Sequence, residues 1–258
     1  MQAGLDPKTL RFEAACLGFS GGAEDKRALT ESLIQSERHS ITHDAEIALT
    51  GATAGEPGII VIAGTGSMAF GRNASGDTAR AGGWGYIYGD EGGAFDIVRQ
   101  ALRAVLRAEE GWGPATSLQA GLLQATGAPN ANALLHRFYG PEYPRSKVAS
   151  FASLVNKAAS AGDEVAIRLL QNAGEQLSEL VRGVYQHLFT TAERVVVAPV
   201  GGTFLSTTLR TTLEERVRTD PGCTVIEPRW SPATGALLQA LRLGGNDKLP
   251  HGMSSRTK

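Results

Sequence analysis

The chain has 258 residues, 42% of them hydrophobic, and its 25 basic and 26 acidic side chains give a formal net charge of −1. This length suits one large domain or two modest ones, and no run of Lys and Arg forms the basic stripe that a nucleic-acid partner would need. No apolar run approaches the ~20 residues of a membrane span and the N-terminus lacks the regions of a signal peptide, so we expect a soluble, cytoplasmic protein without a membrane partner.

The N-terminal part alternates extended and helical patterns. The expected elements are a strand at Arg11–Phe19, a helix at Glu24–Gln35, an extended segment at His39–His43 and a helix at Ala45–Ala54. Asp44 stands where the N-cap of the last helix belongs, because an Asp side chain satisfies free N–H groups of a first turn. The break at Gly55-Glu56-Pro57-Gly58 predicts a domain boundary, so residues 1–55 form one unit and residues 56–243 a second.

A β-meander opens the second unit, because three short apolar runs are separated by glycine-containing turns. Its expected strands are Ile59–Ala63, Ser67–Arg72 and Asp77–Ala81. Apolar residues at helical spacing from Phe95 to Leu106 then begin a long helical region. The later elements are expected to be helices Ser117–Ala125, Ala131–Phe138, Lys147–Ala161 and Glu164–Phe189, strand Val195–Val200, helix Ser206–Arg218, strand Cys223–Glu227 and helix Pro232–Arg242. Residues 244–258 are polar and predict a frayed tail.

Strands that alternate with helices indicate the α/β class. In open sheets of this class, ligands bind beyond the carboxyl ends of the strands. Three expected strands end in the loops Ser20-Gly21-Gly22, Gly64-Thr65-Gly66-Ser67 and Gly201-Gly202-Thr203, and a fourth is followed by Asp44. Glycine allows φ > 0 and a close approach of ligand, so such a loop can fold its N–H groups around a phosphate. We therefore expect the loops to converge on one cleft for a nucleotide and a polar small molecule.

The ordered set of motifs resembles the N-acetylglucosamine kinase branch of the BadF/BadG/BcrA/BcrD ATPase family, within the actin–hexokinase–Hsp70 superfamily. The matching segments are Leu17-Gly18-Phe19-Ser20-Gly21-Gly22, Ile41-Thr42-His43-Asp44-Ala45, Ile62-Ala63-Gly64-Thr65-Gly66-Ser67, Gly82-Gly83-Trp84-Gly85 and Gly89-Asp90-Glu91-Gly92, with weaker matches at Ala173-Gly174-Glu175, Val200-Gly201-Gly202 and Pro232-Ala233-Thr234-Gly235-Ala236. The resemblance implies the actin-like ATPase (ribonuclease H-like) fold. It also implies a kinase that uses ATP and Mg²⁺ to phosphorylate the 6-hydroxyl of an amino sugar such as N-acetylglucosamine.

The resemblance further implies a role for individual residues. Asp44 becomes the expected general base, which accepts the proton of the sugar hydroxyl as the γ-phosphoryl group is transferred. Contacts to the nucleotide are implied for Gly64, Thr65, Gly66, Ser67, Ala173, Gly201 and Gly202. Contacts to the sugar are implied for Ser20, Gly21, Gly83, Trp84, Gly85 and Asp90.

Each of these motifs also has a purely structural interpretation. Asp44 can be a plain N-cap, Gly64-Thr65-Gly66 a tight hairpin turn, Trp84 a core residue and Gly201-Gly202 an ordinary βα loop. The five histidines show no metal-ligand spacing, so we expect no metal held by the protein alone. Magnesium in such sites is held mainly by phosphates and water.

Family members begin with an Asp-Gly-Gly-Gly-Thr-like phosphate loop on a first strand, and this sequence shows neither, so we expect a truncated N-terminal domain. A second hypothesis is therefore a catalytically impaired sugar- or nucleotide-binding protein, because one lost donor to the developing phosphoryl charge costs about 10²–10³ in rate. A third is a redox-activator ATPase of the same family. Its cysteine-ligated cluster is disfavoured by the isolated Cys16 and Cys223.

Two properties stay open at the level of sequence. Loop contacts outside the motifs decide which sugar binds, so glucosamine, N-acetylmannosamine and a muramic derivative are alternatives to N-acetylglucosamine. A missing first strand would leave one edge of the strand around Cys16–Phe19 unpaired. We expect reduced stability, or a homodimer formed through this edge.

Overall fold

The computed structural model describes residues 10–21, 24–191, 193–219 and 222–246. Gly22 and residues 247–258 of the expected tail lie outside the described residues. The strands are β1 (Arg11–Phe19), β2 (Gln35–His43), β3 (Gly58–Ala63), β4 (Ser67–Arg72), β5 (Thr78–Gly82), β6 (Val195–Val200) and β7 (Cys223–Val225). The helices are α1 (Glu24–Leu33), α2 (Asp44–Thr53), α3 (Ala94–Glu109), α4 (Leu118–Thr126), α5 (Ala131–Tyr139), α6 (Arg145–Ser150), α7 (Ala152–Ser160), α8 (Glu164–Leu188), α9 (Thr207–Val217) and α10 (Pro232–Leu243), with a 3₁₀ turn η1 (Gly202–Leu205).

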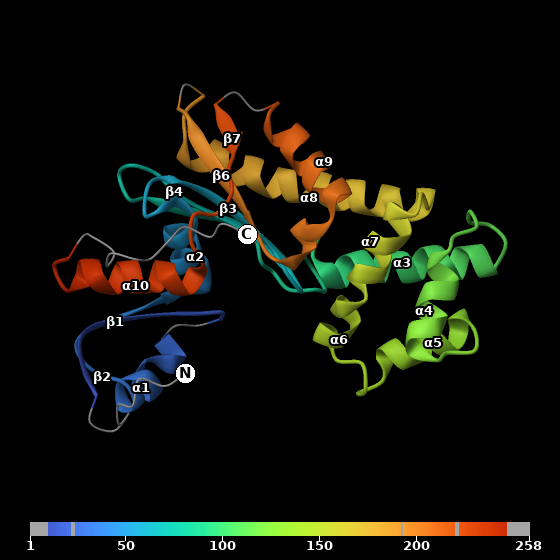
Figure 1. Cartoon of the computed structure of the whole chain (residues 1–258), viewed down its shortest axis with the longest axis horizontal. Coiled ribbons are helices and arrows are strands. Elements are labelled where there is room, and N and C mark those ends of the chain that lie inside the picture. Colours follow the sequence, from blue (N-terminus) through green and yellow to red (C-terminus); the bar gives the residue numbers. More distant parts are fainter. Residues whose placement is uncertain (1–9, 22–23, 192, 220–221, 247–258) are drawn as a thin grey trace.

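A five-stranded sheet in the order β5-β4-β3-β6-β7 forms the centre of the molecule (Figure 1). Strands β3, β4 and β5 are the predicted antiparallel meander, and β6 and β7 extend it in parallel to β3. The continuous apolar run of β3 fits its central place, because both faces of the strand are covered. Ile59 and Val61 belong to the larger core with α8, whereas Ile60 packs on the other face with Leu49 of α2.

Strands β1 and β2 form a second, parallel sheet of two strands, joined by α1. Helix α10 returns from the end of the described chain and packs against α2 and β1 (Figure 1). The contact is close because both helices carry glycine where they meet: a Cβ on Gly235 would lie 2.0 Å from the carbonyl oxygen of Ile47, and one on Gly51 would lie 2.4 Å from that of Ser231. This contact gives a structural reason for the glycine in the segment Pro232–Ala236.

Helices α3 to α7 form a unit that extends beyond the end of the five-stranded sheet (Figure 1). The prediction of one helix over Lys147–Ala161 was wrong, because the chain forms α6 and α7 with a break at Phe151. Phe151 has a ψ of −6° and stacks on Phe138 and Tyr143 with ring centroids 5.8 and 6.3 Å apart. These tertiary aromatic contacts hold the break, and local helical periodicity does not reveal them.

The predicted N-cap role of Asp44 was displaced by one residue. His43 occupies the N-cap of α2 and makes no side-chain cap, and Asp44 is the first helical residue. Its Oδ1 accepts the N–H of Ala45 at 2.8 Å. The segment predicted at His39–His43 is the second half of β2. One-residue differences at helix ends are common, and here Asp44 accepts a first-turn amide from the first helical position instead of from the N-cap.

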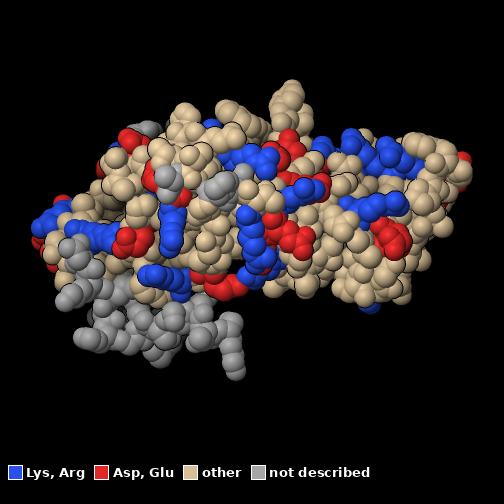
Figure 2. Space-filling model, turned by 90° about the horizontal axis from the view of Figure 1, so that it is seen from above, with Lys and Arg blue, Asp and Glu red and all other residues tan. Residues whose placement is uncertain are grey.

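The described surface shows no large field of one sign on the face drawn in Figure 2, where Lys and Arg side chains lie among Asp and Glu side chains. None of the described helices combines the length and the apolar character needed to cross a membrane. Cys16 and Cys223 form no disulfide with each other: Cys223 is buried and the Cys16 thiol donates to Gln239 Oε1 at 3.0 Å. Burial raises the pKa of Cys16. The division into residues 1–55, 56–243 and 244–258 stays a prediction.

Candidate active site

A first cavity of about 620 Å³ lies between the N-terminal sheet and the β4–β5 hairpin. It brings together four of the predicted site residues, Ser20, Gly21, Asp44 and Gly83. Arg80 and Met68, which the sequence did not single out, line its hairpin side. The cavity therefore combines one carboxylate, small residues with accessible backbone and one cation, a set that suits a polar ligand of sugar size.

Asp44 enters this cavity because β2 ends at His43 and α2 begins with Asp44 itself. The helix buries nearly all its residues from Ala45 to Thr53, so its first turn is rigidly anchored. The Asp44 side chain stays partly exposed at the cavity wall. A negative charge is favourable at a helix N-terminus, and an ionised carboxylate there can accept a proton.

A second cavity of about 410 Å³ opens at the Gly64–Ser67 loop. Predicted residues Gly64, Thr65 and Gly202 line it. The opposite wall belongs to α6 and α7, which contribute the polar side chains Ser146, Ser150, Ser153 and Asn156. Because Ala94, Ile97 and Leu170 also line it, the cavity has apolar as well as hydroxyl-bearing walls.

The Gly64–Ser67 loop presents unused donors. Within the described part of the chain, the N–H groups of Thr65 and Gly66 donate to no other group, whereas Gly64 N–H bonds to the Gly66 carbonyl at 3.0 Å. A Cβ on Gly64 would meet nothing within 4 Å. The Thr65 N–H therefore stands unused next to open space, and backbone N–H groups of this kind bind anions.

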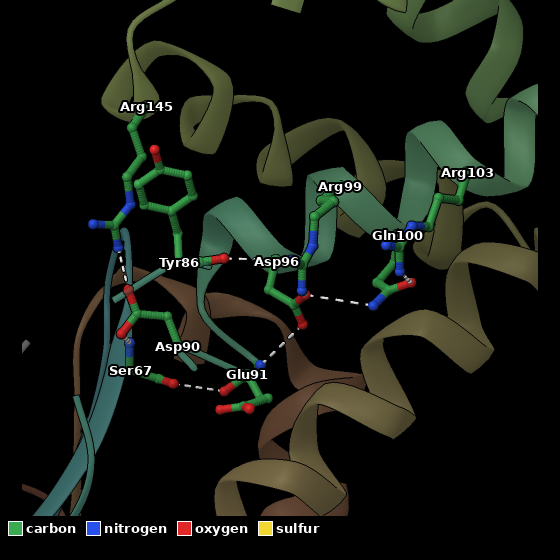
Figure 3. A network of polar contacts seen from close by, with 10 residues as sticks. Ser67, Tyr86, Asp90, Glu91, Asp96, Arg99, Gln100, Arg103 and Arg145 are labelled. Carbon is green, nitrogen blue, oxygen red and sulfur yellow. Dashed lines mark hydrogen bonds and ion pairs between the residues drawn. The ribbon is translucent and has the colours of Figure 1, made fainter. Parts of the chain in front are cut away.

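The two glycine runs of the sequence, Gly64–Ser67 and Gly82–Gly93, pack directly on each other. A Cβ on Gly93 would lie 2.9 Å from the Cα of Gly66, so only glycine permits this contact. Gly92, with a φ of +73°, packs against the carbonyl oxygen of Ala173. The Ser67 hydroxyl donates to the Glu91 carbonyl at 2.6 Å (Figure 3). The second run thus supports the Gly64–Ser67 loop from behind.

Asp90 belongs to this support. Its side chain is 8% exposed and forms an ion pair with Arg145, and its Oδ1 accepts the Ser67 N–H at 3.4 Å (Figure 3). A non-glycine residue at its φ of +63° is uncommon. Asp90 therefore lies behind the loop and lines neither cavity.

Other predicted residues also lie away from the two cavities. Trp84 is 69% exposed, and the Arg80 guanidinium lies over its indole, with Cζ 5.0 Å from the ring centroid. Ala173 is buried on α8 behind Gly92. The residues that line neither cavity are Gly66, Ser67, Trp84, Gly85, Asp90, Ala173 and Gly201.

The single cleft expected from the sequence is divided in the structure. The two cavities share no lining residue: Asp44 faces the first and Thr65 the second. Met68 lines the first cavity and Thr65 the second, so only Gly66 and Ser67 lie between these two lining residues in the sequence. The sequence places Asp44 and Thr65 at strand ends but does not show which cavity each of them faces.

The residues that sequence reasoning missed come from the helical unit and the hairpin. They are Arg80, Arg145, Ser146, Ser150, Ser153 and Asn156. Ser146 and Ser150 lie four residues apart on α6, and Ser153 and Asn156 lie three apart on α7, so each helix turns a polar pair to the cavity. These two spacings were the available signal. Among the described residues, no group of three His, Cys, Asp or Glu side chains could hold a metal ion.

A three-stranded meander continued by two parallel strands, with helices on both faces and a second sheet beside it, defines the actin-like ATPase fold. The solved structure of a Chromobacterium violaceum protein described as an N-acetylglucosamine kinase is similar to this chain, with a TM-score of 0.72 and 29% identity over 88% of this chain and 76% of that one. A Porphyromonas gingivalis structure, 20% identical with a TM-score of 0.64 over 90% of this chain and 77% of its own, shows the same fold.

Residues 1–240 match the BadF/BadG/BcrA/BcrD ATPase family, and the chain belongs to this family. It is 36% identical over 195 residues to the N-acetylmuramic acid/N-acetylglucosamine kinase of Clostridium acetobutylicum, covering 73% of this chain and 63% of that protein. It is 32% identical over 250 residues to the N-acetyl-D-glucosamine kinase of Dictyostelium discoideum, covering 92% of this chain and 77% of that protein. The chain thus spans less than two thirds of the Clostridium kinase.

Proposed function

We propose that this protein is an amino-sugar kinase, which transfers the γ-phosphoryl group of ATP to the 6-hydroxyl of N-acetylglucosamine or a close relative of it. The observation that carries the proposal is a pair of cavities, one lined by Asp44 and one by Thr65, whose linings come within three residues of each other along the chain at Thr65 and Met68. Phosphoryl transfer needs the 6-hydroxyl oxygen in line with the γ-phosphorus, so the proposal requires the two ligands to meet beside this segment. The names of the Clostridium and Dictyostelium kinases support the choice of sugar.

The first cavity is the proposed sugar site. Asp44 accepts the proton of the sugar 6-hydroxyl as the hydroxyl oxygen attacks the γ-phosphorus. Ser20, Gly21 and Gly83 line the same cavity and can offer backbone groups and a hydroxyl to the sugar. Arg80 lines its hairpin side and can donate to sugar hydroxyls, while its guanidinium lies over the Trp84 ring outside the cavity.

The second cavity is the proposed nucleotide site. Its volume of about 410 Å³ lies within the usual range for small-ligand pockets. The free N–H group of Thr65, which lines this cavity, can hold a phosphate oxygen. Gly202 leaves room for a flat base, since a Cβ there would meet nothing within 4 Å. ATP supplies the phosphoryl group, and ADP leaves on this side.

Magnesium enters the proposal with ATP. Mg²⁺ usually keeps several waters and is bound by phosphates with one or two carboxylates. The described residues around Thr65 offer hydroxyls and N–H groups rather than a carboxylate cage. The metal would therefore be carried by the nucleotide, and this chain's contribution is to orient the phosphates.

The proposal is tested by measuring ADP formation from Mg-ATP with and without sugar. N-acetylglucosamine, N-acetylmuramic acid, N-acetylmannosamine and glucosamine are compared, and the product is identified as the 6-phosphate by NMR. We expect ADP formation to depend on one of the N-acetylated sugars. Hydrolysis of ATP at the same rate with and without sugar would instead indicate an ATPase, and sugar binding without turnover would indicate a binding protein.

A further inference from the structure

Arg145, at the start of α6, makes an ion pair with a residue 55 positions earlier in the chain. Its Nη2 donates to Asp90 Oδ2, and the Arg145 side chain is 36% exposed whereas that of Asp90 is 8% exposed (Figure 3). The pair is therefore a buried carboxylate bound by an arginine that reaches in from the helical unit. A carboxylate buried this far needs such a partner.

The Arg145 guanidinium is held in place by more than the carboxylate. It lies 5.3 Å from the ring centroid of Tyr86 and 5.9 Å from that of Phe95. Its Nε is buried without a hydrogen-bond partner among the described residues. The planar group is thus fixed by Asp90 and by the rings, and a lysine ammonium cannot reproduce both contacts.

The ion pair lies directly behind the Gly64–Ser67 loop. A Cβ on Gly66 would lie 2.4 Å from Asp90 Oδ2 and 2.6 Å from Arg145 Nη2. Asp90 also accepts the Ser67 N–H through Oδ1, at 3.4 Å, and the Gly93 N–H through its carbonyl, at 3.1 Å. A change in the Asp90 side chain would therefore be transmitted to both ends of the contact between the two glycine runs.

We propose that Arg145 is a positioning residue for phosphoryl transfer: it holds Asp90, and through Asp90 it holds the Gly64–Ser67 loop, whose Gly64 and Thr65 line the second cavity. The residue that follows it, Ser146, lines the second cavity, so α6 connects the nucleotide side to the back of the loop. The inference rests on the proposed kinase function. It assigns Arg145 an effect on geometry, without contact to either substrate.

The kinetic test compares Arg145→Ala and Arg145→Lys with wild type. We expect Arg145→Ala to lower kcat by about tenfold to a hundredfold, because small displacements of a group that orients reactants have effects of this size. Arg145→Lys should recover part of the loss. Lys147→Ala removes one positive charge from the same helix at an exposed site and should stay within about twofold of wild type. An Arg145→Ala enzyme with wild-type kcat would overturn the proposal.

A double-mutant cycle with Asp90→Asn asks whether Arg145 acts through Asp90. If it does, adding Arg145→Ala to Asp90→Asn should change kcat by less than about threefold, because coupled residues do not contribute independently. A full multiplicative loss in the double variant would show that Arg145 acts elsewhere and would overturn the proposal.

Amide hydrogen exchange gives a readout that does not need kinase activity. In Arg145→Ala, the Ser67 and Gly93 amides, which bond to Asp90, should exchange about tenfold faster, whereas amides of α8 and α9 keep their wild-type rates. Unchanged exchange at Ser67 and Gly93, or faster exchange throughout, would overturn the proposal. If wild type forms no sugar-dependent ADP, the kinase function fails, and this measurement alone decides whether Arg145 holds the loop.

Discussion

The two aspartates assigned to the site by resemblance differ in their surroundings. Asp44 is partly exposed at a cavity wall and accepts one N–H from Ala45. Asp90 is buried, pairs with Arg145 and accepts the N–H of Ser67. A carboxylate whose oxygens are already bound is suited to holding a loop, and one that faces open space is suited to proton transfer. The roles proposed for the two residues rest on these different contacts.

Asp44→Asn removes the proposed proton acceptor without removing the side chain's volume. General-base catalysis contributes about 10²–10⁴ in rate, so we expect kcat of sugar phosphorylation to fall by about this factor. The melting temperature should stay near that of wild type, because asparagine keeps an Oδ1 that can accept the Ala45 N–H. Asp77→Asn, in the exposed β4–β5 turn, is the matched control. Full activity in Asp44→Asn would remove Asp44 from the mechanism.

Asp163 is a third aspartate, and its role is structural. It caps α8 through the N–H groups of Val165 and Ala166, both at 3.0 Å, and it accepts hydrogen bonds from Thr116 and Ser117 before α4. Burial alone would raise its pKa, but the hydrogen bonds from Ala166, Ser117 and Thr116 outweigh burial and lower the pKa to about 2.

Stability should therefore depend on pH through Asp163. Because the folded-state pKa lies below the unfolded value of about 3.9, the contribution is present above about pH 5 and is lost as pH falls toward 2. One pKa unit corresponds to about 1.4 kcal/mol, and solvent screening at this partly exposed site reduces the contribution to about 1–2 kcal/mol. In urea denaturation, the stability difference between wild type and Asp163→Asn should be larger at pH 6 than at pH 3. A difference independent of pH would contradict this assignment.

Among the elements, the contact of α2 with α10 connects the two sheets. Helix α2 covers one face of the five-stranded sheet through Leu49 and Ile60, and α10 packs on its other side. In addition, Gln239 of α10 donates to Thr50 of α2 at 2.7 Å. The close approach requires Gly235, because a side chain there would overlap the backbone of α2.

Gly235→Ala tests this contact. Overpacking of this kind costs about 1–3 kcal/mol, which lowers the melting temperature of a chain of this size by about 2–4 °C per kcal/mol. Gly121→Ala in α4 is the control, since a Cβ there would meet nothing within 4 Å, and alanine is the better helix former by about 1 kcal/mol. An equal response of the two variants would show that Gly235 is not needed for packing.

The elements also show how far the sequence could go. The strands β3, β4 and β6 could be predicted because their apolar runs end in glycine loops, and these patterns are local. The break at Phe151 could not, because it depends on rings at Phe138 and Tyr143 that come near only in the fold. Arg145 could not be predicted for the same reason, since its partner Asp90 is distant in sequence. The division of the cleft depends on which way the Gly64–Ser67 loop faces, and no local pattern records that direction.

At the scale of the whole molecule, the two cavities share no lining residue. We therefore expect each ligand to stabilise the fold when it binds alone. A ligand that binds only the native state at 100 times its Kd contributes about 2.7 kcal/mol. For a chain of this length, that corresponds to a rise in melting temperature of about 5–10 °C. Mg-ATP and N-acetylglucosamine should each produce such a shift when added alone.

Ser150→Phe separates the two sites. Ser150 lines only the second cavity, and a phenyl ring there would fill part of its volume. We expect the shift with Mg-ATP to disappear and the shift with sugar to remain. Lys147→Phe adds the same ring on α6 outside the cavity and should keep both shifts. Survival of the Mg-ATP shift in Ser150→Phe would mean that ATP binds elsewhere. Loss of the sugar shift would mean that the two ligands do not occupy separate cavities, because a ring confined to the second cavity can act only on the ligand bound there.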